Sequence, residues 1–189
     1  MLALEAHFHD VEQARHTYLA SVRYLTTAQG DFRPAMLAGA SWSIAEVTEH
    51  LVHAEHGGVL CIWKAAAAER TGEPIWSEAS VNQGLSIEEV VARTWRPRET
   101  APEGAAPRMG GPLGYWIAAL SNAQSLLPPL TAVLDGLDGS TVIFPHPISG
   151  PLDVRQRLEF LRFHLDRHRG QVEAIKGNPA FPAVAEHGG

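Results

Sequence analysis

The fold is indicated most clearly by residues 154–176, which read VRQRLEFLRFHLDRHRGQVEAIK. Apolar side chains recur along this stretch at steps of three, four and seven residues, as they do on the buried face of an amphipathic helix. The stripe consists of Val154, Leu158, Leu161, Leu165, Val172 and Ile175. The sequence Gly177-Asn178-Pro179 ends the predicted helix near Lys176, because proline cannot continue helical hydrogen bonding. Either Gly150 or Asp153 is the predicted cap at its start.

The same helical period appears in the N-terminal part of the chain. An apolar stripe that only Arg15 interrupts predicts a helix over about residues 5–27. Ser43 and Glu46 have the spacing of a capping box, so a long helix is predicted from there to about Arg70. The glycines at 57–58 are a candidate bend in this second helix.

The middle of the chain predicts shorter elements joined by loops. A second capping box, at residues 86–89, opens a short predicted helix that ends before Pro97. Residues 97–112 carry four prolines and three glycines and are predicted to be a surface loop, either a lid or a crossover. A further helix is predicted over 114–134, kinked or divided at residues 128–129, where two prolines stand. Residues 144–151 are predicted to be a rigid connector.

No segment alternates polar and apolar residues over a strand length between hairpin turns. The pattern therefore predicts an all-α protein, a four-helix bundle with short extra helices and long connecting loops, in which strands are minor or absent. One domain is predicted over residues 1–189, with an ordered core over about 1–178 and a loose tail over 179–189.

Composition narrows the classes of function. The formal charge of −6 and the absence of a basic cluster argue against nucleic acid or an anionic membrane as partner. No apolar stretch approaches the roughly 20 residues that span a bilayer, and the N-terminus lacks a signal pattern, so a cytoplasmic protein is predicted. The single cysteine, Cys61, is predicted to be a buried and inert thiol rather than a nucleophile.

Histidines supply the candidate chemistry. His164 and His168 lie four residues apart and flank the apolar stripe of the last helix. On the predicted helix over 44–70, His50 faces inward, His53 lies at the rim and His56 points outward. Since the chain has ten histidines, the spacing by itself is weak support. Three inward imidazoles can bind one metal ion and leave positions open for water or substrate. From the helical positions alone, core histidines that are hydrogen-bonded to their neighbours are as well supported as a metal site.

Residues 42–55, WSIAEVTEHLVHAE, together with Pro145-His146-Pro147, residues 150–152 and the stretch 163–171, FHLDRHRGQ, resemble the DinB-like, or YfiT-like, metal-dependent hydrolase superfamily. The likeness covers nearly the whole chain. It implies a four-helix bundle that binds one divalent metal, zinc or nickel, and that often forms a homodimer.

By motif, the resemblance assigns the metal ligands to His50, His164 and His168. Members with known chemistry resemble thiol-dependent transferases and isomerases, so the resemblance implies a metal-dependent S-transferase or hydrolase acting on a small molecule. A low-molecular-weight thiol, such as bacillithiol or mycothiol, is the candidate cosubstrate. Three imidazoles alone also suit copper or iron. The alternative is a non-catalytic bundle that binds a metal or a small ligand.

Several neighbouring residues are candidates for supporting roles, and no catalytic residue is assigned. Glu46 lies one turn before His50 and could orient its ring, although the competing role in the capping box is favoured. Gln171 could contact either ring of the last helix or a substrate, or lie on a solvated edge. His53 is a rival third ligand or a proton-transfer group, with plain exposure favoured. His146 could reach the pocket mouth, but surface placement is favoured.

Three tryptophans, Trp42, Trp95 and Trp116, are predicted to pack within the bundle rather than to stack on bases, because no basic groove accompanies them. The chain has no His-Glu-x-x-His sequence, phosphate-binding glycine loop or Gly-x-Ser-x-Gly elbow. Peptidase, nucleotide-binding and ordinary esterase functions therefore lack their usual motifs.

Overall fold

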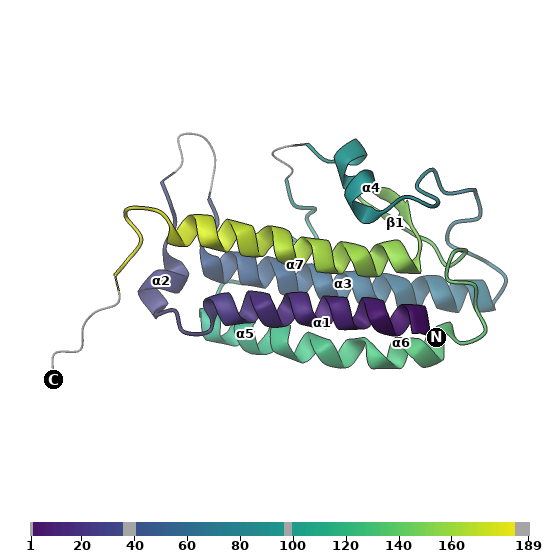
Figure 1. Ribbon diagram of the computed structural model, residues 1–189, viewed down its shortest axis with the longest axis horizontal. Helices are drawn as coiled ribbons and strands as arrows, with labels where there is room; N and C mark the ends of the chain where they lie inside the picture. Colours follow the sequence, from purple (N-terminus) through teal and green to yellow (C-terminus); the bar gives the residue numbers. More distant parts are fainter. Residues whose placement is uncertain (1, 36–40, 97–99, 184–189) are drawn as a thin grey trace.

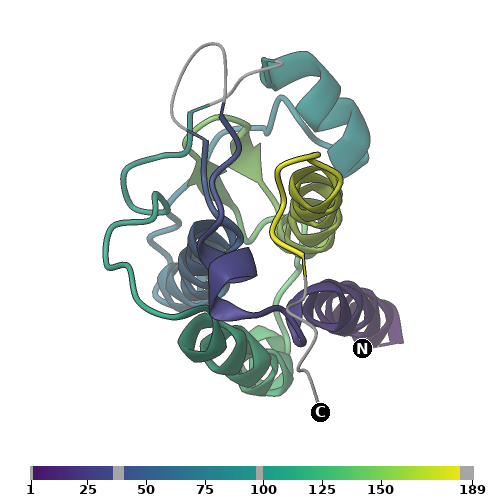
Figure 2. The same ribbon diagram turned by 90° about the vertical axis from the view of Figure 1, so that its left-hand side faces the viewer.

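The computed structural model describes residues 2–35, 41–96 and 100–183, and these residues are mostly helical, in agreement with the predicted all-α class. Long helices run side by side with a rod made of three shorter helical segments (Figure 1). The long helices are α1 (Leu2–Val22), α3 (Ile44–Arg70) and α7 (Val154–Lys176), and the rod consists of α5 (Leu113–Asn122), the 3-10 turn η1 (Ala123–Leu126) and α6 (Pro128–Leu134). Viewed end-on, these elements surround a common interior (Figure 2).

Smaller elements lie outside this packing. The short helix α2 (Thr27–Asp31) packs near the start of α3, while α4 (Ile87–Thr94) and a two-stranded antiparallel hairpin lie over α3 and α7 (Figures 1 and 2). The hairpin consists of β1 (Phe144–His146) and β2 (Gly150–Leu152), with Pro145 opposite Pro151. Because proline has no N–H to donate, this ladder stays short. The predicted connector over 144–151 is thus a minimal sheet.

The predicted apolar stripe of α7 lies in the core. Its six members, Val154, Leu158, Leu161, Leu165, Val172 and Ile175, are each at most 5% exposed. Gly58 explains how closely α3 approaches this stripe, since a Cβ added there would lie 2.8 Å from Leu161 Cδ2. Gly57 faces open space, and α3 continues as an α-helix through both glycines.

Capping explains where the helices begin. The Ser43–Glu46 and Ser86–Glu89 capping boxes are both present, as predicted. At the start of α7, Asp153 rather than Gly150 is the cap, and its side chain accepts from the Gln156 N–H at 2.8 Å. Each cap satisfies backbone N–H groups that have no partner within the helix.

The first helix is shorter than predicted. It ends at Val22 instead of about residue 27, and the apolar stripe does not reveal this boundary. Thr26 caps α2 through a capping box with Gln29, so the chain starts a new helix there. Leu25 continues the apolar period only because it packs on the core from the turn between the two helices.

The helical region predicted over 114–134 is divided, as its prolines require. By length and composition alone, the stretch Leu113–Leu134 is apolar enough to cross a membrane, with a mean hydropathy of 1.2 and 28% of the window buried. The prediction that no apolar stretch approaches that length was therefore wrong. Its buried side chains include Leu113, Trp116 and Leu120, which belong to the hydrophobic core. Trp116 thereby confirms the predicted packing role.

Arg15, which interrupts the stripe of α1, is a core residue. Its guanidinium donates to the Glu55 carboxylate of α3, and both side chains are 3% exposed. Burial raises the pKa of Glu55, while the hydrogen bonds and charge of Arg15 oppose that rise. The polar interruption is therefore one half of a buried ion pair.

The C-terminal tail is held in part. Phe181 packs edge-on against Phe32 at 5.5 Å between ring centroids, and Gln29 Nε2 donates to the Pro182 carbonyl at 2.9 Å. Residues 184–189, the remainder of the predicted loose tail, lie outside the described residues.

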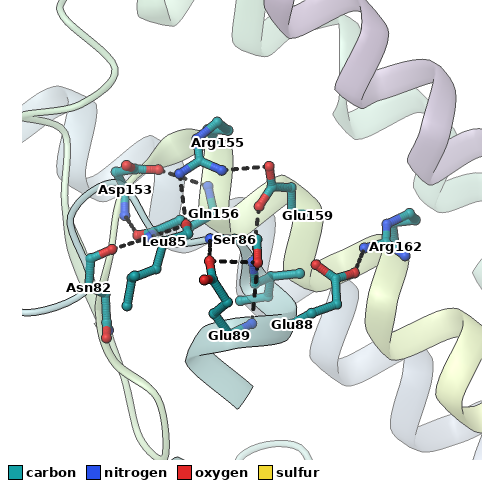
Figure 3. Close-up of polar contacts among 11 residues, drawn as sticks. Asn82, Leu85, Ser86, Glu88, Glu89, Asp153, Arg155, Gln156, Glu159 and Arg162 are labelled. Atoms are coloured by element: carbon teal, nitrogen blue, oxygen red, sulfur yellow. Dashed lines mark hydrogen bonds and ion pairs between the residues drawn. The ribbon is translucent and has the colours of Figure 1, made fainter. Parts of the chain in front are cut away.

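Polar contacts attach α4 to α7 (Figure 3). Arg162 of α7 pairs with Glu88, and Glu159 accepts from the Ile87 N–H at 3.2 Å. Gln156 donates to the carbonyls of Asn82 at 2.6 Å and Leu85 at 3.0 Å. Trp95, which follows α4 directly in the chain, donates its indole N–H to Ser149 Oγ at 2.9 Å.

Candidate metal centre

Three buried imidazoles converge between α3 and α7. His50 lies in the second turn of α3, and His164 and His168 come from successive turns of α7. The Nε2 atom of His164 is 3.0 Å from Nε2 of His50 and 3.1 Å from Nε2 of His168. The three residues are 4%, 6% and 7% exposed, and their candidate ligand atoms all lie within 4.8 Å of one another.

The hydrogen bonds of the outer nitrogens decide which ring atoms have free lone pairs. His50 Nδ1–H donates to the Ala105 carbonyl at 2.7 Å, and His168 Nδ1–H donates to Gln171 Oε1 at 2.8 Å. Both neutral rings therefore present an unprotonated Nε2 towards His164. A single proton on His164 Nε2 can bridge to only one of them, so the cluster has more acceptors than protons.

A shared cation fits these nitrogen atoms. Two nitrogens that each lie about 2.1 Å from one ion are about 3.0–3.4 Å apart when the angle between them is near 90–109°. The two printed separations at His164, 3.0 and 3.1 Å, fall in that range. A divalent metal would use the lone pairs that lack protons, and the donor set of three imidazoles suits it chemically.

Burial keeps the cluster neutral. It lowers the pKa of His168 to about 3, with the charge of His50 as a second cause, and it lowers the pKa of His164 well below the ordinary value. Burial also lowers the pKa of His50, which the hydrogen bond to Ala105 opposes. At neutral pH none of the three rings therefore carries a second proton, and metal binding does not have to displace an imidazolium proton.

The family follows from comparison with known proteins. A family model described as the DinB superfamily matches residues 10–172, which include the three clustered histidines. The chain belongs to the DinB superfamily. Comparisons with curated proteins and with solved structures found no match.

In this DinB-superfamily protein, aromatic rings line the histidine cluster. Trp42 lies 5.0 Å from the His50 ring and 6.5 Å from the His168 ring, between centroids. Phe160 is stacked on His164 at 5.3 Å. Trp42 was predicted as plain bundle packing, whereas the structure places it against two of the three histidines. These rings limit the access of water to the site.

The predicted supporting residues separate into two groups. Gln171 contacts the cluster directly, through His168. Glu46 does not: its carboxylate accepts from the Ser43 N–H at 2.8 Å and from Arg33 at 2.6 Å, and its described contacts do not include His50. The favoured capping role is therefore the one observed.

His53 lies outside the cluster. Its Nε2 is 3.4 Å from Glu49 Oε1, its ring is 5.8 Å from Trp116, and its side chain is 16% exposed. Among the described residues, the group able to hold a metal comprises His50, His164 and His168 only. The structure thus gives no support to His53 as the third ligand.

His146 is half-buried, so the surface placement that we favoured from sequence is wrong. Its ring lies between Trp95, at 6.4 Å, and Phe160, at 4.5 Å, and Phe160 in turn stacks on His164. Its Nδ1 accepts from the Ile148 and Ser149 N–H groups at 3.2 and 3.0 Å. Burial, and then the charge of Arg157, lower the pKa of His146 to about 3.

Glu49 is a site residue that sequence reasoning missed. Its side chain is fully buried next to His50, and it accepts from three consecutive backbone N–H groups. These belong to Arg108 at 2.6 Å, Met109 at 2.6 Å and Gly110 at 3.0 Å. The helical period places Glu49 on the side away from the core, and no local signal shows that a distant loop covers it.

The described part of the predicted loop, residues 100–112, therefore crosses the histidine cluster. Its Ala105 carbonyl contacts His50, and its next residues contact Glu49. Residues 97–99 lie outside the described part of the chain.

Proposed function

We propose that this protein binds one divalent metal ion through His50, His164 and His168 and is a metal-dependent enzyme of the S-transferase or hydrolase type. The observation that supports it is the convergence of three Nε2 atoms, with separations of 3.0 and 3.1 Å at His164 and with too few protons to satisfy them. The metal that we propose is zinc or nickel, as the family resemblance implies.

The ligand number favours a catalytic site over a structural one. Structural zinc normally has four protein ligands, and the described residues offer a group of three. A divalent ion bound there would lower the pKa of a coordinated thiol or water and so supply a nucleophile near neutral pH.

The protein's own residues would prepare that chemistry. The Ala105 carbonyl and Gln171 hold the outer nitrogens of His50 and His168 and thereby fix the orientation of both rings. Trp42 and Phe160 place apolar rings against the histidines, which suits a small organic substrate better than a polymer. We propose a low-molecular-weight thiol as cosubstrate on the same resemblance, and a cytoplasmic location because the N-terminus lacks a signal pattern.

The first experiment measures bound metal. Untagged wild-type protein, His50→Ala, His168→Ala and the control His56→Ala are compared by inductively coupled plasma mass spectrometry, with circular dichroism on each. His56 is a matched control because it is an exposed histidine on the same helix as His50. About one equivalent of metal in wild type and control, lost from the two other variants with helicity retained, is expected.

Activity is then tested with and without a chelator. Thiol addition to electrophiles and hydrolysis of small esters and amides are followed in the metal-loaded protein. Loss of turnover on chelation, with the fold intact, supports an enzyme. Metal-free wild type after metal-replete expression would refute the proposal and favour the alternative, a non-catalytic ligand-binding bundle. Unfolding on chelation would instead indicate a structural metal.

We also propose that the protein is a homodimer and that the rod from α5 to α6 is its partner-facing surface. Residues 113–134 contain no Asp, Glu, Lys or Arg, and Tyr115 on this rod is 57% exposed. Since an uncharged, partly exposed rod suits an interface between copies, Tyr115→Glu is expected to yield monomers by size-exclusion chromatography with light scattering. A monomeric wild type would contradict the proposal.

A further inference from the structure

Glu49 is more than a buried charge beside a metal ligand. It lies in the turn of α3 that carries His50, and its two carboxylate oxygens accept from the N–H groups of residues 108, 109 and 110. We call residues 105–110 the strap. A carboxylate can satisfy three converging donors because it has only acceptor sites, about four in all. Hydrogen bonds to a charged acceptor are also about twice as strong as neutral ones.

The end of the strap has the backbone shape that this contact needs. Gly110 and the next residue, Gly111, have φ values of +69° and +104°, which only glycine adopts easily. The Gly110 carbonyl accepts from the buried Trp116 indole at 3.0 Å. The strap is therefore anchored twice at this end, once to α3 and once to α5.

The start of the strap contacts the metal ligand itself. The Ala105 carbonyl accepts from His50 Nδ1 at 2.7 Å, and the Ala105 N–H donates to the Pro102 carbonyl at 2.9 Å. Adjacent residues of α3, Glu49 and His50, are thus bound by the two ends of one short segment. If the Glu49 contact is lost, the hydrogen bond that remains between α3 and the strap, among the described contacts, is the one that orients the His50 ring.

We propose that Glu49 is a positioning residue for the metal centre: it fastens the strap to α3, so that the Ala105 carbonyl fixes the orientation of the His50 ring. This inference rests on the proposed function, because it takes His50 to be a metal ligand. Glu49 itself does not contact the metal. It acts through the strap backbone, and hydrogen-bond partners of a metal-binding histidine typically change metal affinity about 10- to 100-fold when they are removed.

Two variants remove the contact from opposite sides. Glu49→Gln keeps the side-chain shape but replaces one acceptor oxygen by an NH2 group that faces N–H donors. Met109→Pro removes one of the strap N–H groups without changing α3. Met109→Ala is the matched control, because it keeps the backbone N–H and the Met109 side chain is 65% exposed.

One measurement probes the fastening without any metal. The peptide N–H between Arg108 and Met109 donates to Glu49, and this peptide bond is a trypsin site. Cleavage there requires release of the strap. In metal-free protein, Glu49→Gln is expected to be cut at this bond at least about tenfold faster than wild type or Met109→Ala, as mass spectrometry of the fragments would show. An unchanged cleavage rate would overturn the proposal.

The second measurement uses Co²⁺ alone as the probe. Affinity is obtained by competition with a chromogenic chelator, and visible absorption reports the ligand geometry. Glu49→Gln and Met109→Pro are each expected to bind Co²⁺ about 10- to 100-fold more weakly than wild type and to alter its absorption, while Met109→Ala matches wild type. Circular dichroism establishes that each variant is folded.

The outcomes separate the two proposals. Wild-type Co²⁺ affinity and absorption in both variants, despite faster cleavage of Glu49→Gln, would show that Glu49 fastens the strap but that the strap does not position His50. Only the inference would then fall. A wild-type protein that binds no Co²⁺ would refute the proposed function and, with it, the positioning role. Weaker binding in Glu49→Gln but not in Met109→Pro would overturn the strap as the route of the effect.

Discussion

The histidine that sequence reasoning placed at the surface permits a quantitative test of burial. His146 lies between Trp95 and Phe160, and its Nδ1 accepts from two backbone N–H groups. Replacing it with Asn puts the Asn Oδ1 close to the position of Nδ1, so those two hydrogen bonds are kept while the titratable ring is removed. Loss of the ring packing lowers the free energy of unfolding of the variant equally at every pH. This contribution therefore cancels when the free energies at two pH values are subtracted.

Burial, with the charge of Arg157, lowers the pKa of His146 to about 3, whereas an unfolded histidine has a pKa of about 6.5. As the pH falls through 6.5, the unfolded chain takes up a proton that the native state does not, so the native state loses stability. Between pH 7.5 and 5.5 the loss is about 1.4 kcal/mol for this one residue. The figure is insensitive to the native pKa, provided that this pKa lies well below 5.5.

Urea unfolding of the metal-free protein at pH 7.5 and 5.5 gives the four free energies needed. Wild type is expected to lose about 1.4 kcal/mol more than His146→Asn between the two pH values. The three clustered histidines, whose pKa values are also lowered, contribute their own losses to both proteins and cancel in the comparison. Equal pH dependence of the two proteins would show that His146 is solvated in the native state, and the reasoning from its burial would be refuted.

Two further predictions concern the packing that supports the site. Gly58→Val is expected to lower the free energy of unfolding in urea by about 1–3 kcal/mol, because its Cβ would lie 2.8 Å from Leu161 Cδ2. Gly57→Ala places its Cβ in open space and should instead stabilise α3 by about 0.5–1 kcal/mol. Equal effects of the two substitutions would contradict the close approach of α3 and α7. Glu55→Gln leaves Arg15 buried without its counter-charge and should lower the free energy of unfolding by about 3–5 kcal/mol. The double variant Arg15→Met, Glu55→Leu should recover most of that loss. A Glu55→Gln variant as stable as wild type would show that the pair is not desolvated.

The features that could be predicted from sequence are those that depend on residues close together in the chain. Periodicity identified α7, and capping boxes predicted α3 and α4, because both signals act within about one or two turns. The helical period also separated inward His50 from outward His56. Combined with the family motif, it selected the three histidines that the structure brings together.

Local signals were also the source of the errors. The apolar stripe of α1 continued past Val22 because Leu25 packs on the same core from a turn, and periodicity does not distinguish a helix from a turn that buries a residue at the same step. The prolines beside His146 suggested a rigid connector, with His146 at the surface. They instead limit a short hairpin that α4 and Trp95 cover.

Only the tertiary structure decided which polar side chains are buried, and with what partners. Glu49 and the N–H group of Arg108 are 59 residues apart, and Arg15 and Glu55 are 40 apart. Burial of a side chain depends on which distant element covers it, whereas helical periodicity reports only the face on which it lies. The amino-acid sequence thus determined the helices and the three candidate ligands, while tertiary packing determined the strap, the environment of His146 and the neutral state of the histidine cluster.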